Sequence, residues 1–238
     1  MLQIKQNNKV LIEDFFIKTE NLSVGYRKNF PVITDVSFSI LPSKSYALVG
    51  GNGSGKTTLF RTLTALLQPL GGSIQVAKSI STSYVPQAKK MSLNFPLSVE
   101  EVLYMPQNIG LSFLPKKRYS EKDAELFEKT GIKDILKKQI SQCSGGQLQR
   151  VLILRSLLTN ANLIFLDEPM DSLDHKSRDL FQDVLFDYLK QGERSLFFIT
   201  HSLEHDWKTG FDEIFEIDDG KFYKITDGER PPNCHHHD

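Results

Sequence analysis

The sequence predicts an α/β fold built on a parallel sheet, with a helical segment inserted into it. Short apolar runs alternate with helical segments along most of the chain. Parallel strands need crossover connections, so this order is typical of a parallel sheet covered on both faces. Between about residues 89 and 142 the alternation stops, and prolines and Gly131 separate segments that all look helical.

The first part of the chain holds four expected strands and one helix. Val36, Phe38 and Ile40 alternate with polar residues, which predicts a half-buried strand. A proline and two glycines at 68–72 end the first helix, because neither residue continues a helix well. The elements expected here are strands at 15–22, 36–40, 46–49 and 80–85, and a helix at 57–67.

The second part begins with the helical insertion and then returns to alternation. We expect helices at 99–105, 121–130, 132–138, 147–158 and 176–190, and strands at 163–166, 196–199 and 222–225. These elements predict one domain over residues 1–230, with the helical subdomain at about 89–142 inserted into it. Residues 231–238 are expected to form a disordered tail.

Composition excludes several classes of protein. The chain has 238 residues, 39% hydrophobic and 24% charged, with a net charge of zero, so nothing electrostatic favours a nucleic-acid partner. Two cysteines are too few for a disulfide framework, which fits a reducing compartment. No apolar run approaches the ~18–20 residues that cross a bilayer, and the first residues lack a secretion signal. We expect a cytoplasmic protein that reaches a membrane only through a partner.

A glycine-rich loop between a strand and a helix predicts a phosphate site. Residues 50–57, Gly-Gly-Asn-Gly-Ser-Gly-Lys-Thr, fit the pattern G-x-x-x-x-G-K-[ST]. The glycines let the backbone approach phosphate oxygens, and the loop N–H groups lie at the positive end of the following helix. Lys56 supplies a charge to the outer phosphates, and Thr57 supplies a hydroxyl for Mg²⁺.

Three polar residues follow buried strands and are expected at the ligand-binding edge of the sheet. Asp167 and Glu168 follow the strand at 163–166, and His201 follows the strand at 196–199. Asp167 can hold Mg²⁺ through water, and Glu168 can poise a water for attack on the terminal phosphate. From these residues alone, the two acids could also cap the next helix, and His201 could be a packed or surface histidine.

A second motif identifies the kind of nucleotide-binding protein that the sequence resembles. Ser144-Gly145-Gly146-Gln147 opens a helix just before the buried strand at 163–166. With the glycine-rich loop, this order resembles the ATP-binding cassette (ABC) ATPases over nearly the whole chain. The resemblance implies a P-loop NTPase parallel-sheet core, an antiparallel β subdomain and an inserted α-helical subdomain. Cys143 departs from the leucine that opens the family's signature.

The resemblance assigns roles to individual residues. It implies that the signature of one subunit contacts the ATP bound by the other, that Gln87 contacts Mg²⁺ and the attacking water, and that His201 is the switch histidine. Tyr26 lies where the family stacks an aromatic ring on adenine, although by itself it could be a strand-end residue. Residues 170–174 correspond to the D-loop, with an unusual opening.

The expected site residues fall into four groups. The catalytic group is Glu168, His201 and Gln87, and the Mg²⁺ group is Thr57, Gln87 and Asp167. The signature group that binds nucleotide in trans is Ser144, Gly145, Gly146 and Gln147. The group that binds ATP in cis is Tyr26, Gly50, Gly51, Asn52, Gly53, Ser54, Gly55, Lys56, Thr57 and Thr58.

The resemblance also implies partners and a location. Such proteins form a head-to-tail homodimer on two ATP molecules, bind membrane permease subunits on the inner face of the cell membrane, and serve an extracytoplasmic solute-binding protein indirectly. Residues 94–102 resemble the start of the helical subdomain in zinc, manganese and iron importer ATPases. Siderophore and cobalamin importers look alike here, and a soluble ABC ATPase or a non-hydrolysing scaffold are further alternatives. The tail at 234–237, Cys-His-His-His, could bind metal or be a plain polar tail.

Overall fold

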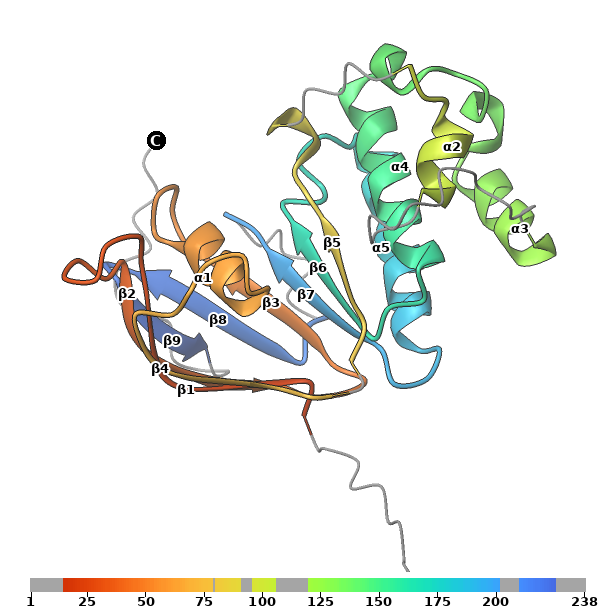
Figure 1. Cartoon of the computed structure of the whole chain (residues 1–238). Coiled ribbons are helices and arrows are strands. Elements are labelled where there is room, and N and C mark those ends of the chain that lie inside the picture. Colours follow the sequence, from red (N-terminus) through yellow and green to blue (C-terminus); the bar gives the residue numbers. More distant parts are fainter. Residues whose placement is uncertain (1–14, 79, 91–95, 106–119, 202–209, 226–238) are drawn as a thin grey trace, which may run out of the picture.

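A computed structural model describes residues 15–78, 80–90, 96–105, 120–201 and 210–225. They form a six-stranded sheet in the order β5-β6-β7-β3-β8-β9 and a three-stranded sheet in the order β2-β1-β4 (Figure 1). The core strands are β3 (Ser45–Val49), β5 (Thr82–Val85), β6 (Leu163–Asp167), β7 (Ser195–Ile199), β8 (Glu213–Asp218) and β9 (Lys221–Ile225). The second sheet contains β1 (Ile17–Val24), β2 (Ile33–Ile40) and β4 (Gly71–Val76).

Five strands of the core sheet run parallel, and β9 pairs antiparallel with β8. Strands β3, β6 and β7 are buried along their whole length, as expected for parallel strands covered on both faces. Alternate residues of β6 and β7 therefore serve two separate cores. Leu163 and Phe165 of β6 pack with α1 (Lys56–Leu63) and the antiparallel sheet, whereas Ile164 and Leu166 pack with the helices of the opposite face.

The face opposite α1 is covered by α4 (Gly145–Leu158) and α5 (His175–Leu189). The helical segment adds α2 (Val99–Tyr104) and α3 (Glu121–Lys129), and Figure 1 shows these helices beyond α4. Short 3-10 turns lie at Ala88–Lys90, Lys133–Ile135 and Ile140–Gln142. None of the helices in the described ranges combines the length and apolarity needed to cross a bilayer.

An aromatic seam joins the two sheets. The Phe38 ring on β2 lies 5.0 Å from Phe215 and 5.3 Å from Phe222, centroid to centroid. Tyr46 on β3 stacks 6.0 Å from Phe197, and its hydroxyl accepts a hydrogen bond from the backbone N–H of Leu41 at 2.8 Å. Burial raises the pKa of Tyr46 to about 12, so the phenol stays neutral inside the core. These contacts hold the antiparallel sheet against the sheet that carries the site.

Several expected elements differ from the structure. The prediction of a helix at 132–138 was wrong, because only the 3-10 turn Lys133–Ile135 forms there. The first helix ends at Leu63 rather than 67, and Ala65 beyond it adopts a left-handed backbone at φ 57°. Strands β4 and β8 were not expected. In β4, Gly72 has φ 73°, and a Cβ there would lie 2.2 Å from the Asn21 carbonyl oxygen, so only glycine fits.

The boundaries of the domain and of its insertion stay predictions, and the expected tail at 231–238 lies outside the described residues. The segment 94–102, which carries a resemblance to metal-importer ATPases, likewise lies partly outside them.

The Asp212 carboxylate contacts the first residue of β3 and the residue before it, and so fixes where this strand starts. The carboxylate accepts hydrogen bonds from the Ser45 backbone N–H at 2.8 Å, the Ser45 hydroxyl at 3.0 Å and the Lys44 ammonium at 2.6 Å. Partial burial raises the pKa of Asp212, but the hydrogen bonds from Lys44 and Ser45 outweigh it and lower the pKa below its usual value. The ionised form is therefore the one that the folded protein stabilises.

We expect Asp212→Asn to lower the free energy of unfolding by about 1–3 kcal/mol at pH 7, measured by urea denaturation. A lowered folded-state pKa gives stabilisation that is full above the unfolded value, ~3.9, and is lost as the pH falls through the folded value. The difference between the two proteins should therefore shrink below about pH 4. Asp183→Asn, which removes an exposed carboxylate from α5, is the matched control. A difference unchanged between pH 7 and pH 3 would contradict the assignment.

Candidate active site

Four parallel strands bring their carboxyl ends to one edge of the core sheet. Ile199 of β7 pairs with Asp167 of β6 and with Leu48 of β3, and Leu166 pairs with Val85 of β5. The segments that follow these strands therefore start at the same level of the sheet. Ligands of open parallel sheets bind at this edge, so the expected residues at 50–58, 87, 167–168 and 201 gather where a ligand is accommodated.

The glycine-rich loop after β3 has the backbone that its sequence predicted. Gly50, Gly53 and Gly55 have φ values of 154°, 84° and 108°, and Gly55 is the N-cap of α1. A Cβ at Gly55 would meet the Ile33 side chain at 2.9 Å, so the loop packs closely against β2. A Cβ at Gly51 or Gly53 would meet no heavy atom within 4 Å, so the other side of the loop is open.

The polar groups of this loop are arranged for an anion. The buried Lys56 ammonium folds over the loop and donates to the carbonyl oxygens of Gly50 at 2.6 Å and Gly51 at 2.8 Å. The Ser54 hydroxyl is buried and has no hydrogen-bond partner among the described residues. A buried polar atom normally has a partner, so this hydroxyl fits a bound phosphate oxygen. Exposed Asn52 and half-buried Thr57 border the open side, whereas Thr58 is buried.

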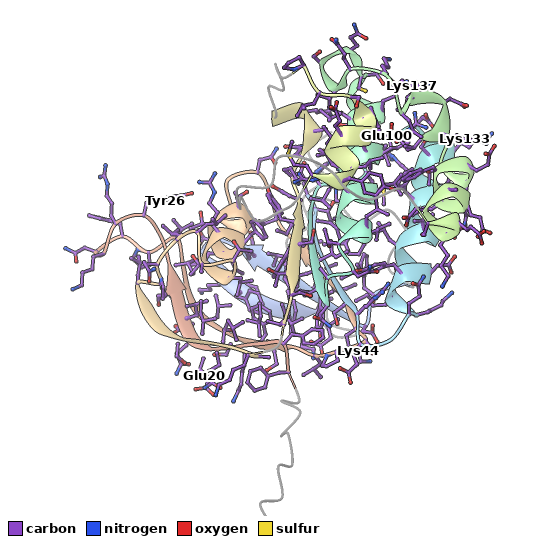
Figure 2. The ribbon with its side chains drawn as sticks, turned by 45° about the vertical axis from the view of Figure 1, so that its right-hand side comes forward. Glu20, Tyr26, Lys44, Glu100, Lys133 and Lys137 are labelled. Carbon is purple, nitrogen blue, oxygen red and sulfur yellow. The ribbon has the colours of Figure 1, made fainter. Side chains whose placement is uncertain are left out.

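Tyr26 lies apart from the loop residues, on the connection between β1 and β2. Its ring is 61% exposed, and its hydroxyl accepts a hydrogen bond from the Arg61 guanidinium of α1 at 3.3 Å. Figure 2 shows it on the side of the antiparallel sheet, away from the helical segment marked by Glu100, Lys133 and Lys137. An exposed ring tethered to the helix that follows the phosphate loop suits stacking on a base, and that role stays a prediction.

Asp167 ends β6 almost completely buried, and a tyrosine contacts its carboxylate. The Tyr84 hydroxyl of β5 donates to Asp167 Oδ2 at 3.2 Å. Burial and the nearby Asp167 charge both raise the pKa of Tyr84, so its hydroxyl remains a donor. Sequence reasoning missed Tyr84. Its position three residues before Gln87, on a strand paired with β6, is the feature from which it could have been found.

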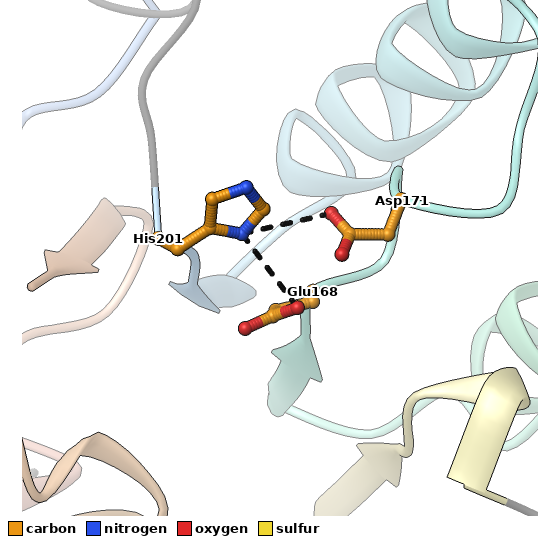
Figure 3. Close-up of side chains that lie close together, drawn as sticks. All are labelled: Glu168, Asp171 and His201. Atoms are coloured by element: carbon orange, nitrogen blue, oxygen red, sulfur yellow. Dashed lines mark ion pairs between the residues drawn. The ribbon is translucent and has the colours of Figure 1, made fainter. Parts of the chain in front are cut away.

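Glu168 forms a polar cluster with Asp171 and His201 (Figure 3). Gln87 also belongs to this cluster. The Glu168 carboxylate accepts a hydrogen bond from Gln87 Nε2 at 2.8 Å and lies 3.7 Å from His201 Nδ1. Asp171 lies 4.0 Å from the same His201 nitrogen and 3.4 Å from Gln87 Nε2. The structure thus brings the three expected catalytic residues together and adds Asp171, which sequence reasoning placed only within the D-loop.

Glu168 has an unusual backbone conformation and a carboxyl whose pKa is shifted by its neighbours. Its N–H donates to the Ile199 carbonyl at 2.8 Å, and its φ of 46° is a left-handed conformation that residues with a side chain seldom adopt. Burial raises the pKa of the Glu168 carboxyl, and a hydrogen bond and charge from Asp171 raise it further, against the opposing effect of His201. A carboxylate of raised pKa is a stronger base for a water molecule.

The signature residues begin α4, on the face of the sheet opposite α1. Ser144 is the N-cap: its hydroxyl accepts from the Gln147 N–H at 3.2 Å, and Gln147 Oε1 accepts from the Ser144 N–H at 3.1 Å. Lys138 also donates to Gln147 Oε1 at 2.9 Å. Half-buried Cys143 packs against the helical core where the family has leucine. Helix α4 begins at Gly145, two residues before the expected start at 147.

Two contacts tie α4 to the catalytic cluster. Buried Gln149 accepts a hydrogen bond from the Ala88 N–H at 2.9 Å, which anchors the segment that carries Gln87. Gly146 lies against the D-loop, since a Cβ there would come within 2.8 Å of the Ser172 carbonyl oxygen. The helix that begins at the signature thus contacts the two segments that carry Gln87 and Asp171 within one chain.

Comparison with known proteins agrees with this geometry. The ABC transporter family model matches residues 33–171. The manganese transport system ATP-binding protein MntB of Bacillus subtilis strain 168 is 33% identical over 198 residues, which are 80% of this chain and 78% of that protein. The zinc import ATP-binding protein ZnuC of Wigglesworthia glossinidia brevipalpis is 34% identical over 187 residues, 79% of this chain and 76% of that protein.

A solved structure of the ATP-binding subunit of an ABC transporter has the same fold. It has a TM-score of 0.72 at 23% identity and covers 89% of this chain and 90% of that chain. The chain belongs to the ABC transporter family, as its ATP-binding subunit. It is an ATPase of that family and binds nucleotide.

The contact between Gly146 and the D-loop can be tested with a matched pair of glycines. A Cβ at Gly145 would meet nothing within 4 Å, whereas one at Gly146 would collide with backbone. We expect Gly146→Ala to lower the free energy of unfolding by about 1–3 kcal/mol, because the D-loop must shift. Gly145→Ala should stay within about 1 kcal/mol of the parent protein. Equal urea midpoints for the two variants would show that the contact is unimportant.

Proposed function

We propose that this chain is the ATP-hydrolysing, energy-coupling subunit of a membrane importer for a transition-metal ion, with zinc, manganese and iron as candidate cargoes. The observation that carries the enzymatic part is the cluster in which Glu168 lies within contact of Gln87, Asp171 and His201 at the ligand edge of the sheet. The cargo is supported by the names of the relatives, a manganese transport and a zinc import ATP-binding protein.

In this proposal Glu168 acts on the water that attacks the terminal phosphate. Its carboxylate accepts a proton from that water as the new P–O bond forms, and the bond to ADP breaks. Gln87, fixed by its hydrogen bond to Glu168, orients the same water. His201 approaches the carboxylate from the opposite side and contributes positive potential when protonated or a hydrogen bond when neutral.

We infer that Mg²⁺ is held by Thr57, Gln87 and Asp167. A hydroxyl, an amide oxygen and a carboxylate are the hard oxygen donors that this ion prefers, and all three lie on segments that meet at one sheet edge. Bound there, Mg²⁺ would neutralise charge on the transferred phosphoryl group. Lys56 and the loop N–H groups position the phosphates.

A homodimer in the ATP-bound state explains why the chain carries two phosphate-binding helix starts on opposite faces of one sheet. Helix α1 packs on one face and α4 on the other. In a head-to-tail pair, Ser144, Gly145, Gly146 and Gln147 of one protomer complete the site of its partner. ATP then joins the subunits, with about 2.7 kcal/mol of stabilisation per site at a concentration ~100 times its Kd. Hydrolysis removes the shared phosphate and releases the pair.

We also propose that the subunit works on the cytoplasmic face of the membrane, bound to integral permease subunits. The helical segment beside Gln87 would contact the permease, because α2 packs on α4 and the Gln87 segment is anchored to α4 by Gln149. A solute-binding protein on the other side would deliver cargo without touching this chain. A siderophore, cobalamin or other importer is the nearest alternative, and a soluble ABC ATPase outside transport is more remote.

The dimer can be tested with the Glu168→Gln variant. We expect it to bind ATP like the parent and to lose ~10²–10⁴-fold in hydrolysis, because the proton acceptor is gone. Since the triphosphate persists, the protein should elute as a dimer in size-exclusion chromatography with Mg-ATP and as a monomer without it. An E168Q protein that stays monomeric at saturating ATP argues against the shared site.

The cargo can be tested in vesicles. The chain is co-purified with its membrane partner from its own cells, reconstituted, and supplied with radiolabelled zinc, manganese or iron together with ATP. We expect ATP-dependent uptake of one of these ions by the parent complex and none by the E168Q complex. Uptake of a chelated-iron or corrinoid substrate instead would establish the alternative cargo. A complex without any permease, with full ATPase activity, would indicate a function outside transport.

A further inference from the structure

Tyr84 contacts two parts of the nucleotide site and lies in the strand that leads to a third, although it belongs to none of the expected groups. Its hydroxyl donates to Asp167 Oδ2 at 3.2 Å. Its ring stacks on Phe60 of α1, with centroids 4.5 Å apart and planes inclined by 29°. In the sequence it is followed directly by Val85, Pro86 and Gln87. One side chain therefore contacts the Asp167 carboxylate and the helix after the phosphate loop, and it projects from the strand that leads to Gln87.

The aromatic contacts fix where the hydroxyl lies. Phe60 is one helical turn beyond Lys56 and also packs edge-on against Phe165 at 5.2 Å. Phe165 is paired with Tyr84 in the sheet and precedes Asp167 by two residues, so all three side chains face α1. The Tyr84 ring is held between α1 and the sheet, and its hydroxyl is aimed at Asp167 by rigid elements.

Packing alone does not require a hydroxyl here. The Tyr84 ring is 37% exposed and would stack on Phe60 equally well as phenylalanine. Asp167 is only 5% exposed, so its carboxylate has few ways to turn. A hydrogen-bond donor on one oxygen of a buried carboxylate orients the group. Hydrogen bonds of this kind, made to a metal ligand rather than to the metal, strongly influence how well the carboxylate binds its metal.

We propose that Tyr84 is a positioning residue, whose hydroxyl holds the Asp167 carboxylate in the orientation that receives the divalent cation of the nucleotide. The inference rests on the proposed role of Asp167 as a Mg²⁺ ligand and adds a residue to it. It predicts that the hydroxyl affects cation binding selectively, while the ring supports the fold through Phe60.

The test is the Mg²⁺ dependence of nucleotide binding, measured with a fluorescent ATP analogue and without hydrolysis. We expect Tyr84→Phe to need about 10-fold more Mg²⁺ for half-maximal enhancement of binding, within the 10–100-fold range of such outer contacts. Binding in EDTA and the thermal midpoint should match the parent, because the ring is retained. Tyr223→Phe, the same change at a tyrosine of similar exposure on β9, should leave every quantity unchanged.

Asp167→Asn separates this inference from the proposal on which it rests. If D167N shifts the Mg²⁺ requirement and Y84F does not, Asp167 keeps its role and the inference about Tyr84 is overturned. If neither variant shifts it, the assignment of Asp167 fails as well. A Y84F protein that loses affinity equally with Mg²⁺ and in EDTA would mean that the hydroxyl serves packing, which also overturns the inference.

Discussion

The hydrogen-bonded register of four parallel strands is the constraint on which the site depends. Ile199 pairs with Asp167 on one side and Leu48 on the other, and β5 continues the same ladder beyond β6. A slip of one residue in any pairing would turn its side chains to the other face of the sheet. Asp167 would then point at α4 instead of α1. Residues from four separate segments can gather at one edge because the ladder holds their strand ends level.

The two helices that begin at sequence motifs, α1 and α4, pack on opposite faces of the core sheet. Helix α1 begins at the glycine-rich loop and α4 begins at the signature, and a helix start is a place where N–H groups can bind an anion. Because they pack on opposite faces, the two halves of the proposed nucleotide site lie on different sides of the sheet. The Gly146 contact with Ser172 and the Gln149 bond to Ala88 then connect the second half to the catalytic cluster of the same protomer.

The strands that are completely buried were predicted best from the sequence. Strands β3, β6 and β7 are uninterrupted apolar runs, and each was found within one or two residues. Strand β4 was missed because it has only half-buried or exposed residues and begins with two glycines. Gln87, Glu168 and His201 were found by motif and by strand ends. Asp171 was not, because its approach to Glu168 results from the tight turn after β6, which no periodicity reveals.

That turn has a consequence for how far this protein can be stabilised. Glu168 carries its side chain at φ 46°, a conformation that costs a residue with a Cβ about 1–2 kcal/mol relative to the right-handed region. Glycine at this position would relieve the cost and give a more robust fold, but it would lack the carboxylate. If Glu168 has the proposed role, stability and hydrolysis make opposite demands on this residue. A chain of this family with glycine here would then be more stable and a poor hydrolase.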